Sequence, residues 1–204
     1  MFWTALLPLA ALASAKSRLR DASPDEASHR RLVTAIRDDT AAALRASRVI
    51  SRVVAVSPDP DCLEWAARHG FWALAEVEPG LNRALDLAAG YATRTWHADG
   101  LVALVGDLPA ATGPALDMLL ARVDGGERAF VADHHGTGTT LLAAGAGAAL
   151  NPRFGHDSAR RHLESGAVPL EADPGLRWDI DTPADLAAVL AAVPVGEHTR
   201  AALG

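Results

Sequence analysis

The sequence predicts an α/β fold in which helices cover both faces of a mainly parallel sheet, giving a three-layer αβα arrangement. Short apolar runs of strand length alternate with helical patterns along most of the chain, which is the pattern of βαβ units. Residues with turn and helix-capping preferences separate these segments. The chain has 204 residues, of which 50% are hydrophobic and 22% charged, as in an ordinary globular protein. We therefore expect one domain that spans residues 1–204.

The first helix is expected between two buried strands. Residues 2–9 are apolar and of strand length, and residues 49–56 form a β-branched run. Between them, the stretch Ser23 to Glu26 reads as a capping box with proline at the first helical position. One face of this helix carries apolar residues at helical spacing, namely Leu32, Val33, Ile36, Ala43 and Leu44.

Two more helices are expected before residue 100. The pair Asp59-Pro60 begins a short helix that Gly70 ends, and residues 71–75 form the next strand. After a turn, an alanine-rich helix runs to about Gly90. These segments continue the alternation of helix and strand.

The second half of the chain keeps the same alternation. Strands are expected over residues 101–105, 130–132, 139–143 and 176–179. Helices are expected to begin near Thr112, Asp157 and Thr182, the last with a capping box formed with Asp185. In a mainly parallel sheet, ligands bind outside the carboxyl ends of the strands, so residues that directly follow these strands are the candidates for a site.

Composition and the start of the chain argue against several classes of partner. The net charge of −6 gives no overall excess of basic residues for nucleic-acid binding. No apolar run reaches the roughly 18 residues of a membrane helix, so we expect no membrane association. The apolar start of the chain lacks the basic residues of a signal peptide, and we interpret it as a buried strand. A single cysteine, Cys62, excludes an internal disulfide and favours a cytoplasmic location.

Three aspartates stand at predicted strand ends. Asp107 follows the apolar run 101–105, and Asp179 and Asp181 lie on one face if that stretch is extended. Each has another interpretation, because Asp107 suits a turn and Asp181 suits the capping of the next helix. Three converging carboxylates are costly without a cation, and their oxygen atoms suit Mg²⁺ or Mn²⁺. The test of this metal site is whether the three side chains converge.

A basic loop is expected after the first strand. Lys16 is the one lysine among 19 basic residues, and it lies with Arg18 and Arg20 in this loop. An ammonium is a compact partner for a triphosphate, and arginine grips phosphate oxygens in a bidentate way. The alternative interpretation is a solvated basic loop.

Two short stretches offer backbone N–H groups to an anion. Gly136 to Thr139 has two glycines and two hydroxyls, although it also suits an ordinary hairpin turn. Arg153 to Gly155, with Ser158 at the start of a predicted helix, offers a second anion site. Both are weak signals because such short turns are common.

The histidines of the second half receive a plain structural interpretation. His134 and His135 are adjacent, but no third metal ligand accompanies them in the sequence, so we interpret them as surface polar residues. His162 is interpreted in the same way. We therefore expect no metal at these positions.

The combination of these motifs, in this order, resembles the guanylyltransferase family of deazaflavin coenzyme F-420 biosynthesis. The matching stretches are residues 15–19, 79–82, 106–109, 130–139, 151–158, 165–168 and 175–183. The resemblance implies a single nucleotidyltransferase domain over residues 1–204, with a nucleotide-diphosphosugar transferase fold that is GT-A-like. It further implies that GTP is joined to phosphoenolpyruvate, 2-phospho-L-lactate or a related phosphoacid, with release of pyrophosphate. With phosphoenolpyruvate the product is enolpyruvoyl-diphospho-guanosine.

The resemblance also implies roles for residues at matching positions. The expected metal ligands, for Mg²⁺ or Mn²⁺, are Asp107, Asp179 and Asp181. The expected contacts to the phosphoacid carboxylate are Thr139, Gly155 and Ser158. The expected nucleotide contacts are Lys16, Arg18, Gly80, Asn82 and Asp107. The expected catalytic residues are Asp107, Lys16 and Arg18.

One departure from the family pattern concerns the triphosphate. Family members often carry a second lysine shortly after the first strand, where this chain has Ala10. We expect that Arg18 or Arg20 compensates, or else that GTP is bound more weakly. The implied reaction needs no general base, because the attacking phosphate oxygen is already ionised near neutral pH. Cations that neutralise and align the two anions therefore suffice.

Several alternatives stay open at this point. The alanine and arginine bias indicates a GC-rich bacterial genome, and by analogy with the family that it resembles this favours phosphoenolpyruvate. The alternatives 2-phospho-L-lactate and 3-phospho-D-glycerate remain. A GT-A glycosyltransferase would place a D-x-D motif after a central strand, whereas the paired aspartates here come late. A non-catalytic nucleotide-binding subunit is favoured only by Ala10. Because the family's product is labile, we also expect hand-over to the next enzyme of the pathway.

Overall fold

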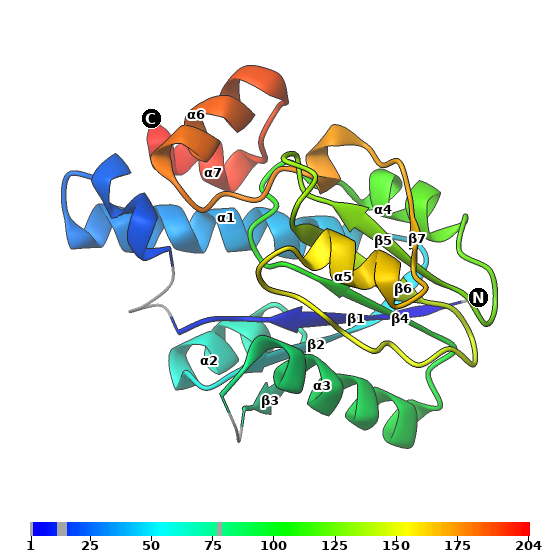
Figure 1. The fold of residues 1–204 in the computed structure, drawn as a ribbon. Helices are drawn as coiled ribbons and strands as arrows, with labels where there is room; N and C mark the ends of the chain where they lie inside the picture. The colour runs from blue at the N-terminus through cyan, green and yellow to red at the C-terminus, as the bar shows by residue number, and fades with distance from the viewer. Residues whose placement is uncertain (1, 12–15, 77–78) are drawn as a thin grey trace.

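A seven-stranded sheet organises the fold (Figure 1). In the computed structural model, which describes residues 2–11, 16–76 and 79–204, its order is β3-β2-β1-β4-β6-β5-β7. The strands are β1 Trp3–Pro8, β2 Ile50–Ser57, β3 Trp72–Ala75, β4 Gly100–Leu104, β5 Arg128–Ala132, β6 Thr139–Ala144 and β7 Val168–Pro169. Four of the six neighbouring pairs are parallel, and the two that involve β6 are antiparallel. The prediction of a mainly parallel sheet is confirmed.

Helices cover both faces of this sheet, which confirms the three-layer arrangement (Figure 1). The α-helices are α1 Glu26–Ala46, α2 Pro60–Arg68, α3 Leu81–Trp96, α4 Gly113–Leu120, α5 Ser158–Glu164, α6 Pro183–Ala192 and α7 Glu197–Leu203. Two short 3₁₀ helices are Ser17–Ala22 and Pro174–Leu176. Residues of α1, α2 and α4 join one buried cluster against the sheet, and residues of α3 and α5 join another.

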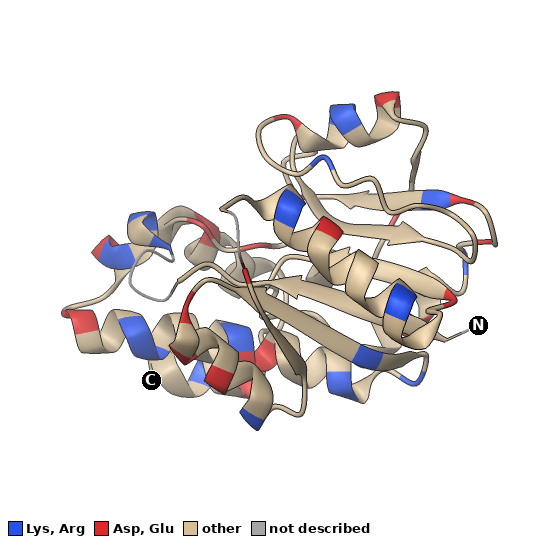
Figure 2. Cartoon of the chain, turned by 90° about the horizontal axis from the view of Figure 1, so that it is seen from below, with Lys and Arg blue, Asp and Glu red and all other residues tan. Residues whose placement is uncertain are grey.

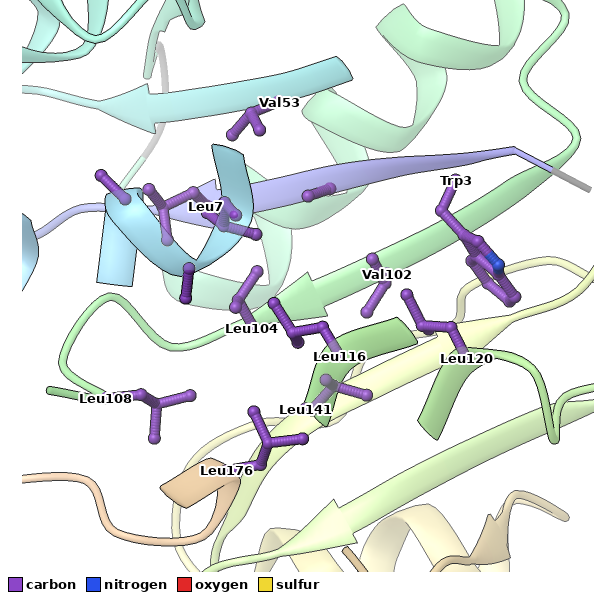
Figure 3. Packing of buried hydrophobic residues seen from close by; sticks show 14 of the residues in the cluster. Trp3, Leu7, Val53, Val102, Leu104, Leu108, Leu116, Leu120, Leu141 and Leu176 are labelled. Atoms are coloured by element: carbon purple, nitrogen blue, oxygen red, sulfur yellow. The ribbon is translucent and has the colours of Figure 1, made fainter. Parts of the chain in front are cut away.

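Alternation along the strands separates these two layers of core. In β1, Ala5 and Leu7 belong to the cluster with α1, α2 and α4, whereas Leu6 belongs to the cluster with α3 and α5. Successive side chains of a strand point to opposite faces, so one strand supplies both layers. Figure 3 shows the first cluster, in which side chains from the strands meet Leu116 of α4.

A third buried cluster fixes the C-terminal helices to α1. It joins α1 to α6 and includes Leu32, Ile36, Leu186 and Val189. The buried carboxylate of Asp39 on α1 also accepts hydrogen bonds from the backbone of α7, at 3.0 Å from the nitrogen of His198 and 2.8 Å from that of Thr199. Helix α7, which the sequence analysis did not predict, is thus capped by a side chain from another helix.

The start of α1 differs from the prediction. The helix begins at Glu26, and its N-cap is Asp25, whose side chain accepts a hydrogen bond from the N–H of Ser28 at 2.6 Å. The predicted cap at Ser23, with Pro24 inside the helix, is therefore wrong. Aspartate and serine cap helices about equally well, so the sequence offered two competing starts.

Helix α3 continues past Gly90, where the sequence analysis ended it, and reaches Trp96. Burial of Ala88 and Ala92 against the sheet outweighs the cost of about 1 kcal/mol for a glycine inside a helix. The predicted N-caps of three other helices are confirmed, namely Asp59, Thr112 and Thr182.

The prediction of a strand over residues 176–179 is wrong, because the described structure has no strand there. The preceding residues form a 3₁₀ turn, and the side chain of Arg177 donates to the carbonyl oxygens of Ala132 and Asp133 at 3.2 and 3.0 Å. The N–H of His134 donates to the carbonyl oxygen of Arg177 at 2.8 Å. These contacts join the segment to the loop after β5, while β7 takes the edge position beside β5.

The reversed direction of β6 brings its first residue to the edge where the parallel strands end. Because β6 is antiparallel to both β4 and β5, the carboxyl ends of β1, β2, β4 and β5 share an edge with the amino end of β6. Asp107 after β4, Asp133 after β5 and Thr139 at the start of β6 therefore lie at the same edge.

The outer surfaces of the helices carry charges of both signs. Figure 2 shows Lys and Arg interspersed with Asp and Glu along them, and Arg30 on α1 pairs with Glu26 at 3.7 Å. Exposed pairs of this kind add little stability, so α1 is held mainly by its buried face. Among the described residues, no helix combines the length and the apolar character needed to cross a membrane.

Candidate functional site

A cavity of about 740 Å³ opens at this edge of the sheet. Its lining includes eight residues that the sequence analysis assigned to the site, namely Lys16, Gly80, Asp107, Thr139, Gly155, Ser158, Asp179 and Asp181. Arg18 and Asn82 are not among the described residues that line it. The fold therefore brings most of the predicted site together from segments that are far apart in the sequence.

Three carboxylates and one ammonium meet in this cavity. Nζ of Lys16 donates hydrogen bonds to carboxylate oxygens of Asp107 and Asp181. Ile180 is fully buried in the cluster between α1 and α6, and Asp179 and Asp181 on either side of it line the cavity. The expected alternation of side chains therefore holds, although these residues do not form a strand in the described structure.

The close approach of the three carboxylates shifts the pKa values of Asp179 and Lys16. Burial, and then the charges of Asp107 and Asp181, raise the pKa of Asp179. Burial alone would lower the pKa of Lys16, but the charges of Asp107 and Asp181 outweigh it and raise that pKa, so Lys16 stays protonated. Crowding of this kind favours the binding of a further cation.

The donor set fits a divalent cation. The carboxylates in the described lining are Glu76, Asp107, Asp133, Asp179 and Asp181. The cationic side chains in the described lining are Lys16 and Arg37. A cavity with this excess of negative charge can hold a polyanionic ligand only when further cations neutralise it. Carboxylate oxygens are the ligands that Mg²⁺ and Mn²⁺ prefer, so the three converging aspartates suit such an ion.

His162 is fully buried, so its interpretation as a surface polar residue is wrong. Its Nε2 accepts a hydrogen bond from the backbone N–H of Arg153 at 2.9 Å, and its Nδ1 lies 2.9 Å from Oγ1 of Thr139. Because Nε2 accepts, Nδ1 carries the ring proton, and this N–H donates a hydrogen bond to Oγ1 of Thr139. The hydroxyl proton of Thr139 is then left to donate to another acceptor, and Thr139 lines the cavity.

The burial of His162 makes the stability of the fold depend on pH. Burial, and then the charges of Arg128, Arg161 and Arg153, lower the pKa of His162 from 6.5 to about 4. Between these values the unfolded chain binds a proton that the folded chain does not, so the free energy of unfolding is largest above pH 6.5 and falls towards pH 4. At about 1.4 kcal/mol per pKa unit, this group contributes on the order of 3 kcal/mol to that change.

We expect the variant His162→Phe to lose this part of the pH dependence. Phenylalanine does not titrate, although it breaks both ring hydrogen bonds and lowers the overall stability. Urea unfolding at about pH 4.5 and pH 7 should therefore show a smaller difference in the variant than in the wild type. The exposed His156→Ala is the control and should keep the wild-type difference. An undiminished difference in His162→Phe would contradict the assignment.

Asn82 braces the loop that carries Gly155. Its amide oxygen accepts a hydrogen bond from the N–H of Phe154 at 2.8 Å, and its Nδ2 donates to the carbonyl oxygen of Phe154 at 3.1 Å. Arg18 is exposed on the 3₁₀ helix Ser17–Ala22. The direct nucleotide contacts expected for Asn82 and Arg18 stay predictions, and the structure gives Asn82 a positioning contact.

Asp133 lines the cavity but was missed in the sequence analysis. It directly follows β5, which is the signal that identified Asp107 after β4. Its carboxylate accepts a hydrogen bond from the N–H of Thr137 at 2.9 Å, and a Cβ on Gly138 would lie only 2.4 Å from its Oδ2. Glycine at position 138 therefore lets the loop approach this carboxylate.

Arg37 is a second missed residue of the cavity wall. It lies on the buried face of α1, beside Val33 and Ile36 at helical spacing, and all three line the cavity. Its Nη2 donates to the carbonyl oxygen of Ala10 at 2.7 Å. The structure thus puts the guanidinium of Arg37 against the position where the sequence analysis noted a missing lysine.

Sequence comparison places this chain among nucleotidyltransferases. Residues 9–171 match the model of the MobA-like NTP transferase domain. In an alignment 209 positions long the chain is 42% identical to a phosphoenolpyruvate guanylyltransferase from Geodermatophilus obscurus, and the alignment covers 99% of this chain and 94% of that protein.

Solved structures share the fold at low sequence identity. A protein from Desulfovibrio desulfuricans described as a nucleotide-diphospho-sugar transferase has a TM-score of 0.72 and 17% identity, over 93% of this chain and 87% of that chain. A Mycobacterium tuberculosis protein in complex with manganese has a TM-score of 0.53 and 17% identity, over 95% of this chain and 100% of that chain. These likenesses confirm the expected nucleotide-diphosphosugar transferase fold.

Proposed function

Because this chain belongs to the MobA-like NTP transferase family, and within it to the phosphoenolpyruvate guanylyltransferases, we propose that it joins GTP to phosphoenolpyruvate. The products are enolpyruvoyl-diphospho-guanosine and pyrophosphate, in a step of coenzyme F-420 biosynthesis, and one domain over residues 1–204 carries the activity. One observation supports this proposed activity most directly. Three carboxylates and one ammonium lie together in one cavity, namely Asp107, Asp179, Asp181 and Lys16.

The reaction joins two anions. An ionised phosphate oxygen of phosphoenolpyruvate attacks the α-phosphorus of GTP, the bond from that phosphorus to the α,β-bridging oxygen breaks, and pyrophosphate leaves in line with the attack. No proton has to be removed. A divalent cation held by Asp107, Asp179 and Asp181, Mg²⁺ in our proposal, would neutralise the phosphates. Lys16 supplies a further positive charge beside the same carboxylates.

The phosphoacid carboxylate is assigned to the wall formed by Thr139, Gly155 and Ser158. Thr139 and Ser158 are buried hydroxyl residues, and all three residues line the cavity. Gly155 has a φ of 111°, which residues with a Cβ rarely adopt. His162 holds Thr139, and Asn82 holds the residue before Gly155, so two buried or partly buried side chains keep this wall in shape.

Arg37 takes the place of the second lysine in this proposal. Replacing it by methionine removes the charge but keeps much of the apolar stem, so we expect Arg37→Met to raise the KM for GTP about tenfold with a smaller change in kcat, a loss of about 1.4 kcal/mol. Steady-state rates at varied GTP concentration measure this. Arg31→Met, on the exposed face of the same helix, should leave KM unchanged. An unchanged KM in a folded Arg37→Met would remove Arg37 from the nucleotide site.

The test of the proposed function is pyrophosphate release from GTP in the presence of Mg²⁺. Phosphoenolpyruvate, 2-phospho-L-lactate and 3-phospho-D-glycerate are run in parallel, and we expect phosphoenolpyruvate to give the highest kcat/KM. A higher value with another phosphoacid would keep the guanylyltransferase activity but change its substrate. Absence of release with all three would favour the non-catalytic subunit instead.

A further inference from the structure

We propose that His134, His135 and Asp185 form a second divalent-metal site, with two imidazole nitrogens and one carboxylate oxygen as ligands for an ion of the Zn²⁺ class. One possible ligand atom from each of the three residues lies within 4.8 Å of the others. The Nε2 atoms of His134 and His135 are 3.9 and 3.8 Å from Oδ1 of Asp185. No third ligand stands near the histidine pair in the sequence, and the fold supplies that ligand from the first turn of α6.

The distances between the candidate ligand atoms are close to those around a bound ion. Tetrahedral Zn²⁺ with bonds of about 2.0–2.1 Å holds its ligand atoms about 3.3–3.4 Å apart. Each of the two Nε2 atoms therefore needs to come closer to Oδ1 of Asp185 by roughly half an ångström, relative to that ideal. His135 is mostly exposed, so its side chain can make this adjustment and leaves a side open for water.

Packing fixes the imidazole of His134. Its ring stacks on Trp178, with 3.9 Å between ring centroids and 16° between ring planes. Its backbone N–H is tied to the carbonyl oxygen of Arg177 at 2.8 Å. Nδ1 of His134 is buried and has no hydrogen-bond partner among the described residues. Because Nδ1 is buried, Nε2, which faces the carboxylate of Asp185, is the ring nitrogen that can bind an ion.

The carboxylate of Asp185 is oriented for the same task. Its Oδ2 accepts hydrogen bonds from the N–H groups of Asp181 and Thr182 at 3.1 and 2.8 Å, and from Oγ1 of Thr182 at 2.9 Å. Oδ1 is the oxygen that faces the two imidazoles. A carboxylate whose other oxygen is held in this way is a preorganised metal ligand.

The chemistry of this site differs from that of the catalytic cavity. Imidazole nitrogens suit Zn²⁺, Co²⁺ and Ni²⁺, whereas the all-carboxylate set of Asp107, Asp179 and Asp181 suits Mg²⁺ or Mn²⁺. Neither histidine nor Asp185 is among the described residues that line the cavity. The two sites should therefore take different ions from a mixture.

Occupancy of this site would connect two parts of the molecule. His134 and His135 lie in the loop between β5 and β6, and Asp185 lies in the first turn of α6. Through its second oxygen, Asp185 also holds the backbone of Asp181, which lines the catalytic cavity. A bound ion would thus fasten the loop to the segment that carries two of the catalytic aspartates.

The test is a direct binding measurement that does not depend on guanylyl transfer. Metal-free protein is titrated with Zn²⁺ by calorimetry in excess Mg²⁺, and with Co²⁺ as an optical probe of nitrogen ligands. We expect one Zn²⁺ per chain, and an affinity at least tenfold weaker in His134→Ala and in His135→Ala. Zn²⁺ should also raise the thermal midpoint of the wild type more than that of either variant.

Two controls keep the result interpretable. The exposed His156→Ala should bind Zn²⁺ like the wild type, and Asp107→Asn should too, because Asp107 belongs to the other site. Thermal unfolding without metal checks that the histidine variants fold; Asp185 is left intact because it caps α6. Equal Zn²⁺ affinity in the wild type and in the double variant His134→Ala/His135→Ala would overturn the proposal. Loss of Zn²⁺ binding in Asp107→Asn would overturn it as well.

Discussion

The variant Asp107→Asn should release pyrophosphate about a thousandfold more slowly than the wild type at saturating GTP and Mg²⁺, a loss of about 4 kcal/mol. Asparagine has nearly the same shape but removes one negative charge from the three converging carboxylates. The fold should tolerate the change, because burial and the charge of Asp107 raise the pKa of Asp179, and removing that charge relieves the crowding. The thermal midpoint should therefore stay close to the wild-type value.

The rate of Asp107→Asn is best compared with that of Asp99→Asn. Asp99 is exposed in the turn before β4, so the same chemical change there should leave the rate unaltered. If Asp107→Asn keeps a rate near that of the wild type with Mg²⁺ present, the metal assignment is wrong.

The variant Lys16→Met should show two opposite effects. Its turnover should fall about a hundred- to a thousandfold, because a positive charge beside the reacting phosphates is lost. Its affinity for Mn²⁺ in the absence of nucleotide should rise, because Lys16 no longer competes for oxygens of Asp107 and Asp181. Electron paramagnetic resonance of free Mn²⁺ measures the second effect independently of activity.

The paired readout separates a local role of Lys16 from general damage. A misfolded variant would lose both turnover and Mn²⁺ binding, whereas the proposal requires them to move in opposite directions. Arg68→Met, which removes an exposed cation on α2, should change neither quantity. Weaker Mn²⁺ binding by folded Lys16→Met would contradict the competition between the ammonium and the metal.

The fold was largely readable from the sequence where local signals agreed. Capping residues such as Thr112 and Thr182 have their effect within a few residues, so they could be located without any knowledge of the tertiary structure. The failed strand over residues 176–179 had an apolar start, but its backbone is engaged by the loop after β5. Such competition between long-range contacts and local pattern is not visible in a sequence window.

The site was predictable where one strand end carried one carboxylate. Asp107 and Asp133 each follow a strand and line the cavity, but only Asp107 was predicted as a site residue. The same reasoning from strand ends would also have predicted Asp133. Arg37 and His162 were harder, because a charged or polar residue in a helix gives no sign that it is buried. The contact between His134 and Asp185 depends on the relative position of a loop and a helix start fifty residues later, which spacing alone does not reveal.

The cap that Asp39 provides for α7 affects the order in which parts of the chain can fold during synthesis. Asp39 is buried and relies on backbone donors from residues near the end of the chain, while Arg37 on the same helix forms part of the cavity wall. During synthesis, α1 emerges before α7. The carboxylate of Asp39 on α1 therefore lacks these hydrogen-bond donors until α7 has been made. A buried carboxylate without partners is costly, and α1 should therefore reach its final position only after His198 and Thr199 have been made. The part of the cavity wall that Arg37 forms should thus be completed only after α7 has been made.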